Sequence, residues 1–120
     1  MKEQRKNLRY ETLATVKIKE IGKEDFPLKD LSITGCRIEF PINKDIMPNM
    51  RFSLKIIPEN AAEVEPFTIN TESRWVSVSG RGCEAGFSLV EPPKGKQFQR
   101  YVDYLSWRWS QGQSMTNTNV

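Results

Sequence analysis

The chain has 120 residues, of which 38% are hydrophobic and 28% are charged, and its 18 basic and 15 acidic side chains give a net charge of +3. These totals fit a single soluble globular domain and exclude a largely disordered chain. No apolar run approaches the ~20 residues that a membrane-spanning helix needs, so we expect no membrane insertion. The N-terminus carries no apolar signal-peptide region, which makes the cytoplasm the expected location.

Histidine is absent and there are only two cysteines, Cys36 and Cys83. The lack of histidine excludes Ser-His-Asp and Cys-His catalysis, and two cysteines without histidine do not make a structural zinc site. Both cysteines stand in strand-like apolar surroundings, so we expect small buried hydrophobic side chains rather than a disulfide. We therefore expect no catalytic residue, no metal site and no cofactor, and a protein that is not an enzyme.

The first eleven residues are polar and basic. Four of the first nine side chains carry positive charge, against the single acid Glu3: Lys2, Arg5, Lys6 and Arg9. Such a block is either a solvated tail or an arm that binds anions, and charge alone leaves both interpretations open. We expect residues 1–11 to form a flexible arm that leads into the fold.

Alternation of apolar and polar residues then predicts a series of short strands. They are expected at 12–20, 26–31, 36–40, 50–56, 67–79 and 83–90. The sequence Gly80-Arg81-Gly82 predicts the turn of a hairpin between the last two strands. Strands at this spacing with no helix between them favour an antiparallel barrel or sandwich.

The spacing of apolar residues changes from that of a strand to that of a helix after Pro92-Pro93. Five apolar residues then follow the spacing of one helical face: Phe98, Tyr101, Val102, Leu105 and Trp109. This pattern predicts a helix over 94–109, which we expect to cover an open end of the barrel. Residues 111–120 are rich in Ser, Thr, Asn and Gln and are expected to form a disordered tail. Residues 1–110 are therefore expected to form one domain.

Two short motifs carry the residues best suited to ligand binding. Arg5 and Arg9 stand four residues apart, and their planar guanidinium groups match phosphate oxygens or the O6/N7 edge of guanine. In the segment 30–35, ionised Asp30 can accept hydrogen bonds from the donor edge of guanine, and Ser32 can donate to a phosphate or accept from a base. Gly35 would supply a positive φ or allow close backbone approach. Ordinary turns use the same residue types, so neither motif decides alone.

Taken together, an RxxxR arm and a DxSxxG turn about twenty residues later resemble the bacterial PilZ family. Arg74-Trp75-Val76 and Gly86-Phe87 extend the resemblance, which covers roughly residues 3–108. It implies a mostly β fold, a six-stranded antiparallel PilZ-like β-barrel with a C-terminal α-helix and a flexible N-terminal arm. It also implies that the ligand is the second messenger cyclic-di-GMP. The implied ligand-binding residues are Arg5 and Arg9 in the arm, with Asp30, Ser32 and Gly35 on the barrel wall.

Three further residues, Lys6, Arg37 and Arg74, are additional candidates for contact with the ligand. We expect Trp75, Trp107 and Trp109 to pack in the core or against the helix rather than to stack on the ligand. The expected mechanism is ligand-induced ordering of the arm, which alters the binding of a downstream protein effector.

Two other functions stay open: a PilZ-like protein-interaction adaptor, and a small β-barrel that binds single-stranded nucleic acid. The low net charge and the lack of alternating aromatic and basic residues argue against the latter, so no nucleic-acid partner is expected. The sequence predicts neither an oligomeric state nor the identity of the effector.

Overall fold

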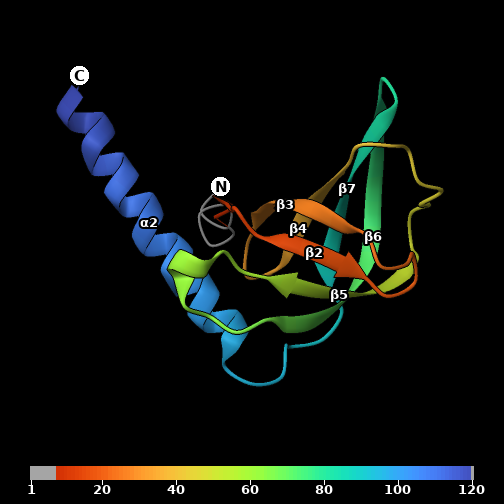
Figure 1. Ribbon diagram of the computed structural model, residues 1–120, viewed down its shortest axis with the longest axis horizontal. Helices are drawn as coiled ribbons and strands as arrows, with labels where there is room; N and C mark the ends of the chain where they lie inside the picture. Colours follow the sequence, from red (N-terminus) through yellow and green to blue (C-terminus); the bar gives the residue numbers. More distant parts are fainter. Residues whose placement is uncertain (1–7, 120) are drawn as a thin grey trace.

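A computed structural model describes residues 8–119, with side chains as far as residue 112, as a closed antiparallel barrel with one helix against it (Figure 1). The barrel strands are β2 (Thr15–Ile18), β3 (Asp25–Leu31), β4 (Gly35–Phe40), β5 (Arg51–Ile57), β6 (Phe67–Ser79) and β7 (Gly82–Leu89). Neighbouring strands follow the order β3-β2-β5-β6-β7-β4, and pairing of β3 with β4 closes the ring. The expected six-stranded barrel is confirmed.

Alternating side chains fill the barrel, as the strand patterns predict. The largest barrel side chains with almost no exposed surface are Val16, Ile18, Phe26, Leu28, Leu31, Ile38, Phe40, Leu54, Ile56 and Ile69. Cys36 and Cys83 are free and point into the same core, which confirms the prediction that both are buried. Burial of these apolar groups is the main force that holds the barrel closed.

A two-residue strand, β1 (Tyr10–Glu11), pairs with β3 on the edge that β2 also uses. Thr12 interrupts the strand between them: its hydroxyl donates to the carbonyl of Leu28 and accepts from the amide of Ala14. Side-chain bonds of this kind replace ladder bonds and end a strand. The expected strand over 12–20 is therefore shorter, and the described end of the expected arm (1–11) lies on the barrel. Arg5 and Lys6 lie outside the described residues.

The helix α2 (Gln97–Asn119) begins three residues later than predicted and continues beyond the predicted end at Trp109. The start is delayed because Gly95 has a left-handed φ of 79°. The helix continues as far as Asn119, through most of the segment expected to form a tail, because a polar composition without proline does not stop a helix. Most of the predicted apolar face is buried: Phe98, Tyr101, Val102 and Leu105.

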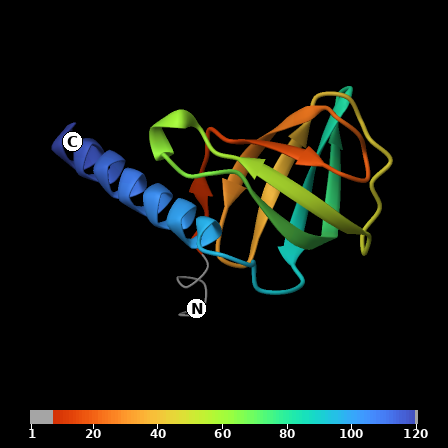
Figure 2. The same cartoon turned by 60° about the horizontal axis from the view of Figure 1, so that its bottom comes forward.

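The helix lies across one end of the barrel, and its C-terminal half projects away from it (Figure 2). Phe98 and Tyr101 pack on Phe67 at the start of β6, with ring centroids 6.0 and 6.1 Å apart. The short 3-10 helix η1 (Asn60–Ala62) lies at the same end (Figure 1). Among the described residues, no helix is both long enough and apolar enough to cross a membrane.

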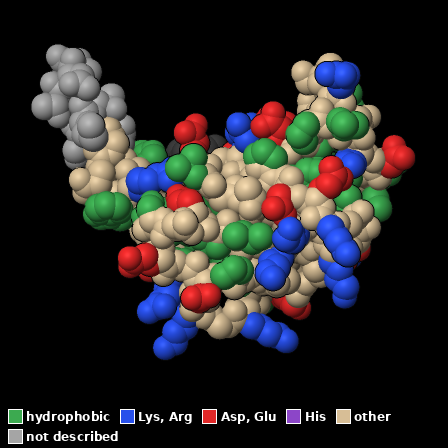
Figure 3. Space-filling view, in the orientation of Figure 1, with side chains coloured by type: hydrophobic (Ala, Val, Ile, Leu, Met, Phe, Trp, Pro, Cys, Tyr) green, Lys and Arg blue, Asp and Glu red, His purple; other side chains and the backbone are tan. Residues whose placement is uncertain are grey.

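Charges of both signs are mixed on the face shown in Figure 3, where Lys and Arg side chains stand among Asp and Glu and among exposed apolar groups. Ion pairs join neighbouring strands on the outside of the barrel, such as Lys17 with Asp25 and Arg51 with Glu72 at 3.1 Å. This face therefore lacks the continuous basic stripe that general nucleic-acid binders present.

Candidate functional site

The turn between β3 and β4 is held together by Ser32. Its hydroxyl is fully buried and accepts hydrogen bonds from the backbone amides of Thr34 and Gly35, at 3.1 and 3.2 Å. The amide of Ser32 donates to the carbonyl of Gly35 at 2.8 Å. The sequence suggested that Ser32 reaches a ligand, whereas in this structure its hydroxyl is engaged within the turn. Ser32 shapes the turn that follows Asp30.

Gly35 allows β4 and β7 to approach closely. A Cβ atom built on Gly35 would lie 2.2 Å from the carbonyl oxygen of Phe87, far inside normal contact distance. Gly35 is not among the residues with positive φ. Of the two reasons the sequence offered for this glycine, close backbone approach is confirmed and left-handed geometry is wrong.

Asp30 lies between two arginines on the outer wall of the barrel. Arg9 Nη1 donates to Oδ1 of Asp30 at 3.1 Å, and Arg37 Nε donates to Oδ2 at 3.0 Å. A bulge at Lys29 turns Asp30 outward, because the β3–β4 register shifts between Leu28 and Asp30. The structure thus brings together a residue of the arm, a residue of the wall and one of the three additional candidates.

Arg37 is fixed on its other side by Glu84, whose carboxylate accepts from Arg37 Nη1 at 3.2 Å. Partial burial disfavours the charged guanidinium, but Asp30 and Glu84 together outweigh that effect and raise the pKa of Arg37. Arg37 is therefore a permanent cation that connects β3, β4 and β7.

The core beneath this site is chemically inert. Cys36 lies next to Arg37 on the inner face of β4 and has no exposed surface. Burial, reinforced by the nearby Asp30 carboxylate and opposed by Arg9, raises the pKa of the Cys36 thiol to about 12. A thiol that stays protonated at neutral pH is a poor nucleophile and a poor metal ligand. Among the described residues, no group of three or more His, Cys, Asp or Glu side chains is placed to hold a metal ion.

Trp75 lies at the end of a row of outward-facing residues that begins at Asp30 and crosses neighbouring strands. The strand registers place Asp30 opposite Arg37, Arg37 opposite Gly86, and Gly86 opposite Trp75. The indole lies over Gly86, because a Cβ atom there would be 2.2 Å from Trp75 Nε1. Trp75 is 42% exposed, so the expectation that it packs in the core or against the helix is wrong. A glycine facing outward opposite an aromatic residue would have indicated this position, but the pairing depends on the β6–β7 register.

The other two tryptophans lie on α2. Trp109 contacts Tyr10 of β1 edge to face at 6.3 Å, which agrees with a role in helix packing. Trp107 is 59% exposed and contacts Tyr104 within the helix. Neither ring belongs to the row that contains Asp30.

Arg74 occupies the bulge of β6, where the register shifts between Ser73 and Trp75. Its Nε donates to the hydroxyl of Ser88 at 2.7 Å, and its Nη1 lies 3.5 Å from a carboxylate oxygen of Glu72. Ser88 stands opposite Gly35 in the β4–β7 register. Arg74 therefore lies beside the turn, in the row next to that of Asp30.

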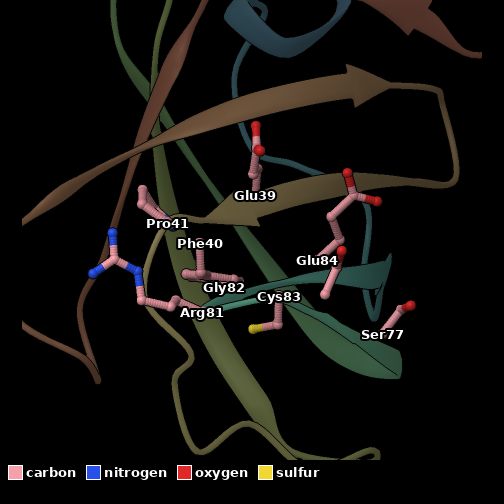
Figure 4. A pocket seen from close by; sticks show the side chains of 9 residues that line it. Glu39, Phe40, Pro41, Ser77, Arg81, Gly82, Cys83 and Glu84 are labelled. Carbon is pink, nitrogen blue, oxygen red and sulfur yellow. The ribbon is translucent and has the colours of Figure 1, made fainter.

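Two hollows border the row. One, of about 420 Å³, lies beside the break between β1 and β2 and is lined in part by Leu13, Lys29 and Arg37. The other, of about 500 Å³, lies at the far end of β4 and β7, where Glu39 and Glu84 stand opposite each other (Figure 4). The first hollow has Lys29 and Arg37 against the single acid Glu11, whereas the second has Arg81 against Glu39 and Glu84, so the first suits a phosphate-containing ligand better.

Comparison with known proteins agrees with this fold. The family model of the PilZ domain matches residues 3–106. Among solved structures, the inhibitor of motility MotI/DgrA of Bacillus subtilis superposes with a TM-score of 0.74 at 16% identity, over 90% of this chain and 52% of that chain. This chain thus spans about half the length of MotI/DgrA.

A second solved structure is the PilZ domain of YcgR from Escherichia coli, determined with c-di-GMP. It has a TM-score of 0.68 and 17% identity, over 92% of this chain and 98% of that chain. No curated protein matches. Because the family model covers most of the chain, the chain belongs to the PilZ domain family.

Proposed function

We propose that this chain binds cyclic-di-GMP on the outer wall of the barrel, where Arg9 meets Asp30. The observation that carries the proposal is the 3.1 Å ion pair between these two residues, which stand 21 positions apart. It brings one residue of each motif into contact. The family membership and the fold shared with the c-di-GMP complex of YcgR support the same ligand.

The chemistry of the site matches the ligand. Cyclic-di-GMP carries two phosphodiester anions and two guanines. Arginine offers planar donor pairs that fit phosphate oxygens and the O6/N7 edge of guanine, and an ionised Asp30 accepts from the N1 and N2 donors of guanine. The exposed indole of Trp75 offers a flat surface on which a base can stack.

The Asp30 carboxylate binds two guanidinium groups, those of Arg9 and Arg37. We expect the ligand to replace one of these ion pairs: an arginine moves to a phosphate or to a guanine O6/N7 edge, and the donor edge of guanine takes its place on Asp30. Arg5, outside the described residues, would act with Arg9. Ordering of the arm then changes the surface offered to a protein effector.

A single-stranded nucleic-acid binder fits less well, because acidic and basic side chains are mixed on the face in Figure 3 and the net charge is only +3. Competition separates the two functions: an oligonucleotide should not displace bound cyclic-di-GMP. Strong displacement of cyclic-di-GMP by the oligonucleotide would favour nucleic-acid binding as the function.

The direct test is calorimetric titration of cyclic-di-GMP into wild type and Arg9→Ala. Loss of one charge-assisted hydrogen bond of about 1.5–3 kcal/mol predicts at least tenfold weaker binding without unfolding. Arg100→Ala, a change of the same residue type on the exposed side of α2, is the matched control and should bind as wild type does. Equal affinity of a folded Arg9→Ala variant would remove Arg9 from the site.

A further inference from the structure

Helix α2 is fastened to β1 by Arg108. Its Nη1 donates to a carboxylate oxygen of Glu59 at 2.8 Å, and its Nη2 donates to the backbone carbonyl of Glu11 at 2.9 Å. The other carboxylate oxygen of Glu59 accepts from the hydroxyl of Tyr101 at 2.6 Å. One guanidinium thus joins the helix, the loop after β5 and the strand that follows Arg9.

The bond between Arg108 and Glu59 is partly shielded from water, whereas the bond from Arg108 to the Glu11 carbonyl lies at the surface. The side chain of Glu59 is 13% exposed and that of Arg108 is 33% exposed, and Tyr101 is fully buried. The partly buried ion pair with Glu59 is stronger than one on an open surface, and it fixes the guanidinium that donates to Glu11. A second contact lies beside them, since Trp109 meets Tyr10 edge to face at 6.3 Å. The helix therefore holds both residues of β1.

The position of β1 decides whether Arg9 can reach Asp30. The strand contains only two residues, and Glu11 pairs with Asp30 itself in the β1–β3 register. So short a strand makes few ladder bonds, and its placement depends on contacts from outside the sheet. Arg108 supplies such a contact at the carbonyl of Glu11, two residues after Arg9.

We propose that Arg108 is a positioning residue for ligand binding, which places β1 and therefore Arg9 before the ligand arrives. This inference rests on the proposed function. When β1 is already in place, a larger fraction of the protein molecules can bind the ligand directly, and the apparent affinity scales with that fraction. By linkage, bound ligand also strengthens the docking of α2 on β1.

The test compares Arg108→Ala with Arg100→Ala, which removes the same side chain from the same helix away from β1. We expect Arg108→Ala to weaken cyclic-di-GMP binding about three- to tenfold and Arg100→Ala to leave it unchanged. Without ligand, the amide of Thr12, bonded to the carbonyl of Lys29, should exchange faster in Arg108→Ala. Amides in the middle of β5 should keep their protection.

A double mutant distinguishes positioning from general destabilisation. If Arg108 acts through Arg9, adding Arg108→Ala to Arg9→Ala should cost little further affinity, whereas independent effects multiply. Should Arg108→Ala fail to fold, Glu59→Gln weakens the ion pair that anchors Arg108 but leaves the bond to the Glu11 carbonyl, and it should give a smaller loss of cyclic-di-GMP affinity; an unchanged affinity would count against the positioning role.

The outcomes separate the two proposals. Wild type that binds no cyclic-di-GMP overturns the proposed function, and the exchange of the Thr12 amide still reports whether Arg108 holds β1. If the wild type binds cyclic-di-GMP but Arg108→Ala binds it equally tightly, the positioning role alone is overturned. The same holds if the losses of affinity in the double mutant multiply fully.

Discussion

Alanine at Gly35 and alanine at Gly86 should have different consequences, although a new Cβ atom would be 2.2 Å from its nearest neighbour at both positions. At Gly35 that neighbour is the backbone carbonyl of Phe87, which is fixed within the β4–β7 ladder. The gap must grow by about 0.8 Å even to reach 3.0 Å. The adjacent bond from the amide of Leu89 to the carbonyl of Thr34, now 2.9 Å long, would then break.

Overpacking of this kind costs about 1–3 kcal/mol, and a lost ladder bond adds about 1 kcal/mol. We therefore expect Gly35→Ala to lower the free energy of unfolding by about 2–4 kcal/mol, or Tm by roughly 10 °C for a domain of this size. At Gly86 the neighbour is the indole of Trp75, which is 42% exposed and free to rotate into solvent. Gly86→Ala should cost under about 1 kcal/mol but displace the indole from the site.

Urea unfolding followed by circular dichroism measures the first effect, and tryptophan fluorescence with calorimetric titration measures the second. Gly112→Ala, on α2 where a Cβ atom would meet nothing within 4 Å, is the control for the loss of a glycine. A stable Gly35→Ala beside a strongly destabilised Gly86→Ala would refute this account of the two contacts.

Two further predictions concern charge. Asp30→Asn should weaken cyclic-di-GMP binding at least tenfold in calorimetric titration, because the amide turns a donor toward groups that need an acceptor; wild-type affinity would contradict this role. The free energy of unfolding should fall as pH rises above about 9, since unfolded Cys36 ionises near its ordinary value of 9.0 and the folded thiol only near pH 12. Burial and the Glu59 carboxylate raise the pKa of Tyr101, so this residue lowers the free energy of unfolding further at higher pH. In urea titrations at graded pH, Cys36→Ala should flatten the first part of the decline.

Local patterns predicted the strands well where one face is buried. The predicted strand over 67–79 coincides with β6, and over its first seven residues every second side chain is buried. The same rule missed the break at Thr12, since a hydroxyl bonded to the backbone competes with the ladder without changing the apolar pattern. The end of the helix was misplaced because polar residues that fit a loose tail also fit an exposed helix.

The site was predictable only as far as its motifs reach along the chain. Arg9 and Asp30 were identified together, and the structure brings them into contact through the pairing of β1 with β3. The roles of Trp75 and Arg108 depend on cross-strand register and on the docking of α2, which no local pattern encodes. Ser32 stays a predicted ligand contact: a hydroxyl suits a phosphate and a turn equally well, and the structure shows only its bonds within the turn.

The two ion pairs of Asp30 are not equivalent, and their difference indicates which arginine moves on binding. Arg9 is 51% exposed and donates to Asp30 alone among the described residues, and such half-exposed pairs contribute about 0–1 kcal/mol. Arg37 is 35% exposed, stands within β4 and is also held by Glu84. The pair with Arg9 is therefore the easier one to exchange for guanine, while Arg37 stays to hold the carboxylate in place. In NMR spectra of the arginine side chains, ligand should shift the Arg9 signal more than that of Arg37; the reverse order would make the wall, not the arm, the moving half of the site.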